Sequence, residues 1–271
     1  MCQPTLKPDR GKKGGQKLRS GVYASCFLSH TDQGPMVLYD VSIGHAGEYA
    51  DDILNHRALD LKPPNVMSDA LGNNKVTVIP VQKNLCNAHA QRQFIDIENS
   101  FPEQAQWIVE QYQKIFQYFE KTQSSSKAAR VCLRYHQRYS KPIFEKIQQW
   151  CEQQLLEHGE QHSTLAKALQ YVLNHYEGLT AVCQFEHAHI DNNAAERALK
   201  LIIRNRKSSL FCKTEAGAHT TNIITSIVAT CAAQNVNAFE YMIWLQQNRV
   251  QVKHNPDAFT PWVYQKLNSP Q

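Results

Sequence analysis

A carboxylate lies among several cationic side chains between residues 189 and 207. Asp191 and the two asparagines after it are residue types that cap helices, and apolar residues at helical spacing follow them. This segment is therefore predicted to begin a helix, with Glu196 in its first turns and one turn before Lys200. The basic residues that follow Glu196 are Arg197, Lys200, Arg204, Arg206 and Lys207.

This arrangement has two interpretations. A carboxylate beside several cations suits metal-dependent phosphoryl transfer on DNA, in which the acid holds a divalent ion and the bases hold phosphates. The alternative is an ordinary capped surface helix with a Glu196–Lys200 pair. Because such pairs are common on helices, the segment taken by itself favours the second interpretation.

Length and charge set broad limits on the protein class. The 271 residues, 42% of them hydrophobic, are enough for one large domain or for a domain with an insertion. Basic residues gather at 1–20 and 191–213, although the net charge is only +5, and this pattern favours a polyanionic partner over a membrane. The longest apolar run, 223–236, contains Thr, Ser, Gln and Asn and is predicted to be a core helix rather than a membrane span.

The cysteines point to a reducing compartment. Eight of them are scattered without a C-x-x-C pair, and no secretory leader is evident, so reduced thiols and a cytoplasmic location are expected. Cys86 and His89 could form half of a zinc site with Cys183, His187 or His189. Their spacing is not diagnostic, and packing or hydrogen bonding near the site is the favoured role for both.

The hydrophobic pattern changes from short alternating runs to long helical stretches. The expected elements are strands at 21–29, 35–41, 66–71 and 76–81, a helix at 45–56, and helices from about 87 to 182 with a loop at 121–127. Turn residues at 31–34 predict that the first two strands form a hairpin. Asp69 is expected at the tip of the third strand. This order is typical of an α/β sheet interrupted by an all-helical insertion.

Several short motifs occur in order along the chain. They are HAGE at 45–48, MSDAL at 67–71, CNAHAQRQF at 86–94, YHQ at 135–137 with Ser140, DNN at 191–193 with Glu196 and Arg197, RK at 206–207, NP at 255–256 and PW at 261–262. From about residue 19 to residue 264, the chain resembles the sixty-six family of bacterial insertion-sequence transposases. Several motifs in register are far more specific than any one of them.

The resemblance implies a ribonuclease-H-like α/β fold, with a mixed sheet and helices inserted before the last acid of a DDE active site. Carried onto this sequence, Asp69 is the second catalytic acid and Glu196 is the last, and both would hold Mg²⁺ or Mn²⁺. The implied partner is double-stranded DNA at the element ends, bound by a homo-oligomer during transposition. The implied phosphate contacts are Arg197, Lys200, Arg204, Arg206 and Lys207.

One part of the family pattern is missing. The first catalytic acid of relatives stands on a strand upstream of the segment at 19–23, where this chain has only Asp9, without an apolar run. Asp40 lies in a predicted strand, but in a register where relatives have an aromatic or apolar residue. We therefore expect the first strand and its acid to be absent. The hairpin and the Asp69 strand would then lack their common neighbour, and their backbone groups would be unpaired. This predicts either a damaged fold or a stand-in strand, and weak catalysis at best.

The expected organisation has four parts. They are a loose basic segment at 1–18, the first part of the core at 19–100, the helical insertion at 101–185 and the last part of the core at 186–271. The expected function is metal-dependent cleavage and strand transfer of insertion-sequence DNA. One alternative is an inactive remnant that binds DNA or full-length partners and modulates transposition. Another is a metal-dependent nuclease outside transposition, which would not need the ordered motifs.

Three polar residues near these motifs are expected to have structural roles. Asp191 is expected to cap a helix rather than to bind metal, because its two asparagine neighbours share that propensity. His45 and Glu48 stand near a predicted helix start and are expected to brace the sheet.

Overall fold

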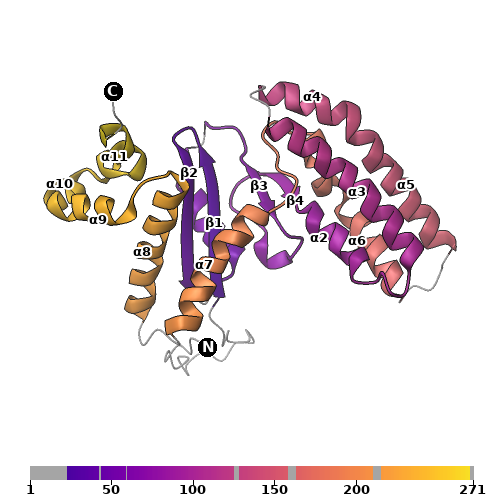
Figure 1. The fold of residues 1–271 in the computed structure, drawn as a ribbon, viewed down its shortest axis with the longest axis horizontal. Coiled ribbons are helices and arrows are strands. Elements are labelled where there is room, and N and C mark those ends of the chain that lie inside the picture. The colour runs from indigo at the N-terminus through magenta and orange to yellow at the C-terminus, as the bar shows by residue number, and fades with distance from the viewer. Residues whose placement is uncertain are drawn as a thin grey trace. The chain divides into compact units, whose positions relative to one another are not determined.

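The protein is a mixed α/β molecule with mostly helical structure and two compact units (Figure 1). The computed structural model describes residues 23–42, 44–58, 60–124, 128–157, 163–209 and 215–268. Unit 1 combines Met1–Ala50 with Asn193–Gln271, and unit 2 is Asp51–Asn192. The predicted basic segment at 1–18 lies outside the described residues.

Unit 1 contains the predicted hairpin. Strand β1 (Tyr23–Thr31) pairs antiparallel with β2 (Gly34–Ser42) along its full length. A two-residue turn joins them, and Gly34 has φ +109°, a conformation that residues with a side chain rarely adopt. The Thr31 hydroxyl stabilises this turn by donating to the Gly34 carbonyl oxygen at 2.9 Å. The hairpin prediction is confirmed.

Helix α7 (Asn193–Ser209) packs on one face of this hairpin (Figure 1). Its apolar face meets Val37 and Tyr39 of β2, and the Tyr39 hydroxyl donates to the Ala198 carbonyl oxygen at 2.7 Å. Ile202 is 3% exposed in the same cluster. The helix predicted at the segment from Asn193 onwards is confirmed, with its apolar stripe on the hairpin.

Helix α8 (Glu215–Ala233) runs along the outer edge of β2. The Thr230 hydroxyl accepts from Val37 N–H at 3.0 Å and donates to the Val37 carbonyl oxygen at 3.1 Å. The Ser226 hydroxyl accepts from Tyr39 N–H at 2.9 Å. Side chains therefore satisfy backbone groups that a further strand would otherwise pair.

The expectation of a core helix at 223–236 is only partly right. A helix is present, but Ile223 and Ile224 are each 48% exposed, while Thr225 and Thr230 are buried. The strand edge explains this inversion, because its open N–H and C=O groups need polar partners, which an apolar face could not supply.

The remaining described helices of unit 1 are α1 (Ala46–Leu54), which follows the hairpin, and those that follow α8. The chain passes from unit 1 to unit 2 within α1. His45 N–H donates to the Glu48 carboxylate at 3.2 Å, and the rings of His45 and Tyr23 lie 4.4 Å apart, so the two polar residues of the HAGE motif have structural contacts. The C-terminal elements are α9 (Ala238–Gln247), α10 (Arg249–His254), the 3-10 helix η3 (Pro256–Phe259) and α11 (Pro261–Asn268).

Unit 2 begins with a short parallel strand pair. Strand β3 (Asn65–Ser68) pairs with β4 (Gln82–Leu85), and Asp69 follows β3 directly, as predicted. The short 3-10 helix η1 (Gly72–Asn74) lies between the two strands.

The strand predicted at 76–81 is wrong. The Asp51 carboxylate accepts from the N–H groups of Thr77 and Val78 at 2.8 and 3.3 Å, so a side chain takes the place of a strand partner. Pro80 has no N–H to donate. The true strand, β4, has the polar sequence QKNL and carries little apolar signal.

The described strands form two separate two-stranded sheets. The hairpin and β3 therefore share no neighbouring strand among the residues that the structure describes. The absence of the central strand and the single ribonuclease-H-like sheet both stay predictions.

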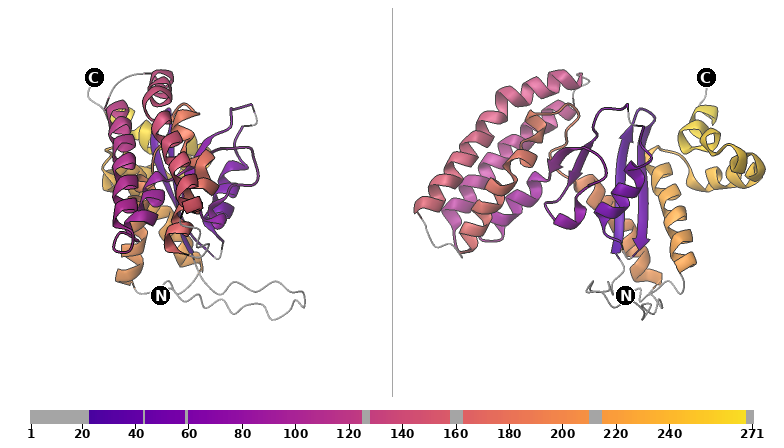
Figure 2. Two further views of the ribbon diagram at one scale, coloured as in Figure 1. Left: turned by 90° about the vertical axis from the view of Figure 1, so that its right-hand side faces the viewer. Right: turned by 180° about the vertical axis from the view of Figure 1, so that it is seen from behind.

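Five helices make up most of unit 2 and lie side by side (Figures 1 and 2). They are α2 (Asn87–Ile95), α3 (Pro102–Gln123), α4 (Ala129–Tyr139), α5 (Lys141–Glu157) and α6 (Thr164–Leu179), followed by the 3-10 helix η2 (Ala181–Cys183). This confirms the helical stretch predicted from about 87 to 182, and the predicted insertion at 101–185 falls within unit 2. The core also takes residues from outside that insertion, including Leu85, Phe94 and Ile190.

No helix in the described part of the chain is long and apolar enough to cross a membrane.

Candidate functional site

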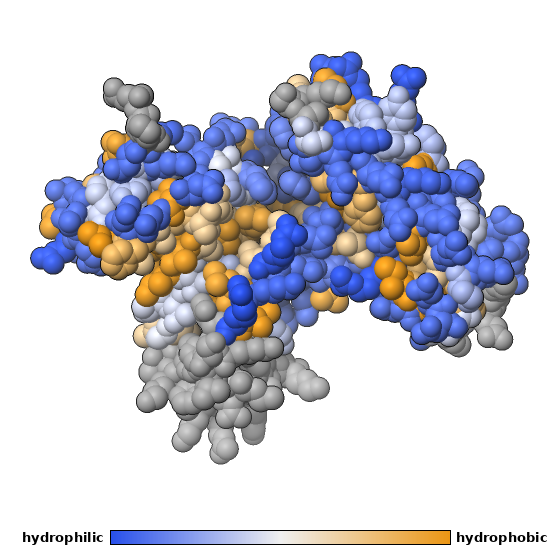
Figure 3. Space-filling view, in the orientation of Figure 1, coloured by the Kyte–Doolittle hydropathy of each residue, from blue (hydrophilic) through white to orange (hydrophobic). Residues whose placement is uncertain are grey.

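One exposed face of α7 is basic. Arg197, Lys200 and Arg204 are all exposed, and their spacing of three and four residues places them on the same side of the helix. The hairpin covers the opposite side. Figure 3 shows hydrophilic surface along α7, drawn in blue. From Arg197 to Arg204 the helix axis rises about 10 Å, which equals about three base-pair steps of DNA.

The other two predicted phosphate contacts continue this helix. Arg206 and Lys207 belong to α7, but their side chains lie outside the part that the structure describes. Their membership of the basic face stays a prediction.

Glu196 stands in the first turn of α7 and is partly buried. It lies one turn before Lys200, and this spacing places the two residues on the same face of the helix. Glu196 belongs to unit 1.

Asp69 belongs to unit 2, where it is partly buried at the end of β3. Its Oδ1 accepts from Leu71 N–H at 3.2 Å and from the Asn74 amide, so the carboxylate is held on one side. Its Oδ2 makes no hydrogen bond among the described residues. A rigid carboxylate with one oxygen to spare is a suitable donor for a hard cation such as Mg²⁺.

A second acid is held at the same end of this strand pair. Cys86 N–H donates to the Ser68 carbonyl oxygen at 3.0 Å, and Asn87 N–H donates to the Ile190 carbonyl oxygen at 3.0 Å. Asp69 directly follows Ser68, and Asp191 directly follows Ile190. The backbone N–H groups of two consecutive residues, Cys86 and Asn87, therefore hold the two segments that carry these acids. Because α7 begins at Asn193, the residue at its N-cap position is Asn192 rather than Asp191.

Two metal sites were considered from the sequence, a zinc site at Cys86 and a magnesium site at Asp69 and Glu196. In that part of the chain, no three side chains of the His, Cys, Asp and Glu types come together in a way that could hold a metal ion. Cys183, a possible zinc partner of Cys86, instead points its thiol at the His136 carbonyl oxygen at 3.6 Å. The pairing of Asp69 with Glu196 stays a prediction.

Cys86 occupies a buried position at the start of α2. Burial raises the pKa of its thiol, and the backbone N–H groups of Asn192, His89 and Ala88 point at the sulfur and oppose that shift. The residue is 1% exposed. A buried, protonated thiol of this kind packs and accepts hydrogen bonds, and it is a poor nucleophile.

Asn87 is a residue that the sequence patterns leave without a role. It lies within the CNAHAQRQF motif, is 1% exposed and donates its side-chain amide to the carbonyl oxygens of Leu179 and Ile190 at 3.0 and 3.2 Å. The available signal was an asparagine at the first position of a predicted helix, where its side chain can bind neighbouring backbone groups.

The family of this chain follows from comparison with known proteins. The sequence model of the transposase IS66 family matches residues 4–220 of the chain. The chain belongs to this family. This IS66-family chain is 23% identical over 210 residues to the uncharacterized protein y4hP of Sinorhizobium fredii, covering 70% of the chain and 37% of y4hP.

A second relative gives a similar picture. The IS66-family chain is 27% identical over 168 residues to the uncharacterized protein y4jD of the same organism, covering 60% of the chain and 32% of y4jD. The chain therefore spans about a third of the length of these relatives. No solved structure matches it.

Proposed function

We propose that this IS66-family chain is part of a transposase that cleaves and joins DNA at the ends of an insertion sequence. The observation that carries the proposal is the exposed basic face of α7, formed by Arg197, Lys200 and Arg204, beside the partly buried Glu196. Cations on a rigid helix bind successive phosphates without reading the bases. Family membership supports DNA as the partner. We also expect the protein to form a homo-oligomer during transposition.

Salt dependence of DNA binding tests the basic face. Fluorescence anisotropy with a labelled 30-base-pair duplex would give the dissociation constant at several salt concentrations. Changing Arg197, Lys200 and Arg204 together to Gln removes three phosphate contacts. The slope of log affinity against log salt should then become shallower by about 3, because each contact releases about 0.9 counterion.

A matched control removes the same charge elsewhere. Arg130, Arg134 and Arg138 are exposed along one side of α4 in unit 2, and changing them to Gln lowers the net charge equally. The α4 variant should keep the unmodified slope. An equal change of slope in both variants would mean that DNA responds only to net charge, and the α7 assignment would be wrong.

We also propose that Asp69 and Glu196 are ligands of Mg²⁺ or Mn²⁺. Carboxylate oxygens suit these hard cations, and Asp69 has an oxygen without a hydrogen bond among the described residues. Such a cation supplies charge that activates a nucleophile and stabilises the leaving oxygen of a phosphodiester. Asp69 would orient it through the bonds to Leu71 and Asn74, while the α7 cations hold the flanking phosphates.

A Mn²⁺ binding experiment tests the two ligands. Binding is measured as the decrease in the electron paramagnetic resonance signal of unbound Mn²⁺. Asp69→Asn and Glu196→Gln should each weaken binding several-fold, while Glu186→Gln, the same type of change at an exposed acid, should not. Cleavage of a labelled element end in Mg²⁺ or Mn²⁺ should be weak and should vanish in Glu196→Gln. Cleavage that survives this substitution removes Glu196 from the mechanism.

A second candidate function needs only the exposed basic face of α7, formed by Arg197, Lys200 and Arg204. A chain of this kind could bind DNA or a longer partner through α7 and modulate transposition without cutting. Salt-sensitive DNA binding, with intact duplex after incubation in Mn²⁺, would favour this function over catalysis.

A further inference from the structure

Three segments of unit 2 meet at the first residue of α2. The Asn87 side chain donates to the carbonyl oxygen of Leu179, at the end of α6, and to that of Ile190. Its backbone N–H donates to the same Ile190 oxygen. The Ile190 carbonyl therefore receives two hydrogen bonds from one residue, while the end of α6 receives a third.

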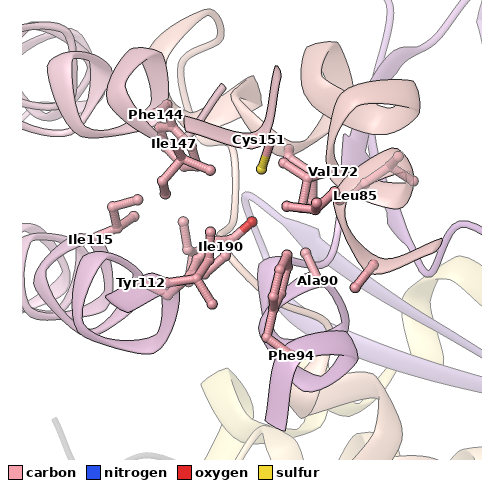
Figure 4. Packing of buried hydrophobic residues seen from close by; sticks show 14 of the residues in the cluster. Leu85, Ala90, Phe94, Tyr112, Ile115, Phe144, Ile147, Cys151, Val172 and Ile190 are labelled. Carbon is pink, nitrogen blue, oxygen red and sulfur yellow. The ribbon is translucent and has the colours of Figure 1, made fainter. Parts of the chain in front are cut away.

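The segment from Ile190 to Asn192 is held at two further points. The Ile190 side chain is 2% exposed and lies among the buried side chains of the helical core, with Tyr112 close by (Figure 4). At the other end of the segment, Asn192 N–H points at the Cys86 sulfur. Neighbouring residues of one motif, Cys86 and Asn87, thus bind both ends of these three residues.

We propose that Cys86 and Asn87 are positioning residues that fix the point at which the chain leaves unit 2 and enters α7. Asn192 is the last residue of unit 2, and Asn193 begins α7. Glu196 is four residues beyond Asn192, so the chain keeps their Cα atoms within about 14 Å of each other. The consequence for metal binding rests on the proposed function, whereas the positioning itself does not.

A nearby asparagine shows that burial alone does not explain Asn87. Asn84 on β4 is 0% exposed, and neither polar atom of its side chain has a hydrogen-bond partner among the residues that the structure describes. Removing the Asn87 amide leaves buried carbonyl groups unpaired, whereas removing the Asn84 amide breaks no bond. The two residues have the same type and equal burial, and they differ in their partners.

The reactivity of Cys86 reports directly on this segment. In the unmodified chain, iodoacetamide should label Cys86 slowly, because the thiol is buried and protonated. In Asn87→Ala, local opening should raise the Cys86 labelling rate about tenfold, since two hydrogen bonds are lost. Mass spectrometry of the peptides gives the rate at each cysteine. Cys151, buried in α5 of the same unit, is the internal reference and should keep its rate.

Asn84→Ala is the matched control and should leave both labelling rates unchanged within about twofold. An unchanged Cys86 rate in Asn87→Ala would overturn the proposal. An equal rise at Cys86 and Cys151 would also overturn it, because that outcome means a general loss of stability. This measurement needs neither metal nor DNA, so its result does not depend on whether the proposed catalytic function holds.

Mn²⁺ binding then tests the link to the site. Under conditions where both variants are folded, Asn87→Ala should weaken Mn²⁺ binding several-fold, while Asn84→Ala should not. If Asp69→Asn weakens binding but Asn87→Ala does not, the segment is held for a purpose other than the metal site and that link is wrong.

Discussion

His136 of the YHQ motif is a buried polar residue that specific partners hold in place. Its Nδ1 lies 2.9 Å from the Ser140 hydroxyl, and its Nε2 lies 3.1 Å from the Thr122 hydroxyl. All three residues are buried. A neutral imidazole can donate to one hydroxyl and accept from the other, whereas an imidazolium could only donate. The motif therefore has a structural explanation as a link between α3, α4 and the start of α5.

This arrangement predicts acid sensitivity. Burial lowers the pKa of His136 from 6.5 to about 4. Between these values the unfolded chain binds a proton that the folded chain does not. The free energy of unfolding should therefore fall as the pH drops from 6.5 towards 4, by at most about 1.4 kcal/mol per pH unit, and this effect should be absent above pH 6.5. Urea unfolding followed by circular dichroism at pH 7.5, 6 and 5 measures it.

A variant without a titrating ring isolates this contribution. His136→Gln keeps a donor and an acceptor, so it should lose less stability than the unmodified chain between pH 6.5 and 4. Equal losses in the two proteins would place the acid sensitivity at other groups.

Helix α8 is attached to the hairpin by hydrogen bonds between its side chains and the backbone of β2. One hydroxyl, that of Thr230, satisfies both the N–H and the C=O of Val37. Thr230→Val keeps the shape of the side chain but leaves both buried backbone groups unpaired. The free energy of unfolding should fall by about 1–3 kcal/mol, as measured by urea unfolding.

The same substitution ten residues earlier is its control. The Thr220 hydroxyl is exposed and donates to the Ala216 carbonyl oxygen of its own helix at 2.9 Å. Thr220→Val should change stability by less than about 0.5 kcal/mol. A comparable loss in both variants would mean that the hydroxyl on the strand edge has no special role.

The period of the hydrophobic residues predicted correctly those helices and strands that have one face in the core and one face in water. The hairpin, α7 and the helices of unit 2 follow this rule. Strand β4 does not, because its residues QKNL are placed by pairing with β3 and by packing on α6 through Leu85, which lies against Gly178. The burial pattern of α8 was also missed, because a strand edge that needs polar partners cannot be recognised before the sheet is known.

The candidate site divides in the same way. The spacing of Arg197, Lys200 and Arg204 is a local property, so their place on one side of a helix can be read from the sequence, while their role as phosphate contacts stays a prediction. The role of Asn87 depends on Leu179 and Ile190, which are about ninety and one hundred residues away in the chain. Such partners are brought together only by the fold, and no local sequence pattern predicts them.

The two units differ in how many segments of the chain they contain. Unit 1 joins two distant segments, whereas unit 2 is the continuous stretch Asp51–Asn192. The core of unit 2 uses Leu85, Phe94 and Ile190 in addition to residues from the long helices. Its stability should therefore depend on residues that flank the helical insertion predicted at 101–185.

A comparison of two fragments tests this dependence. Residues 51–192 expressed alone should fold, with a helical circular dichroism spectrum and cooperative urea unfolding, because all members of the core cluster are present. Residues 101–185 lack α2, β4 and Ile190 and would expose the side chains that these elements cover. That fragment should bind the dye ANS and unfold without a sharp transition. If the shorter fragment unfolds as cooperatively as the longer one, the flanking residues contribute little and the helical insertion is the true folding unit.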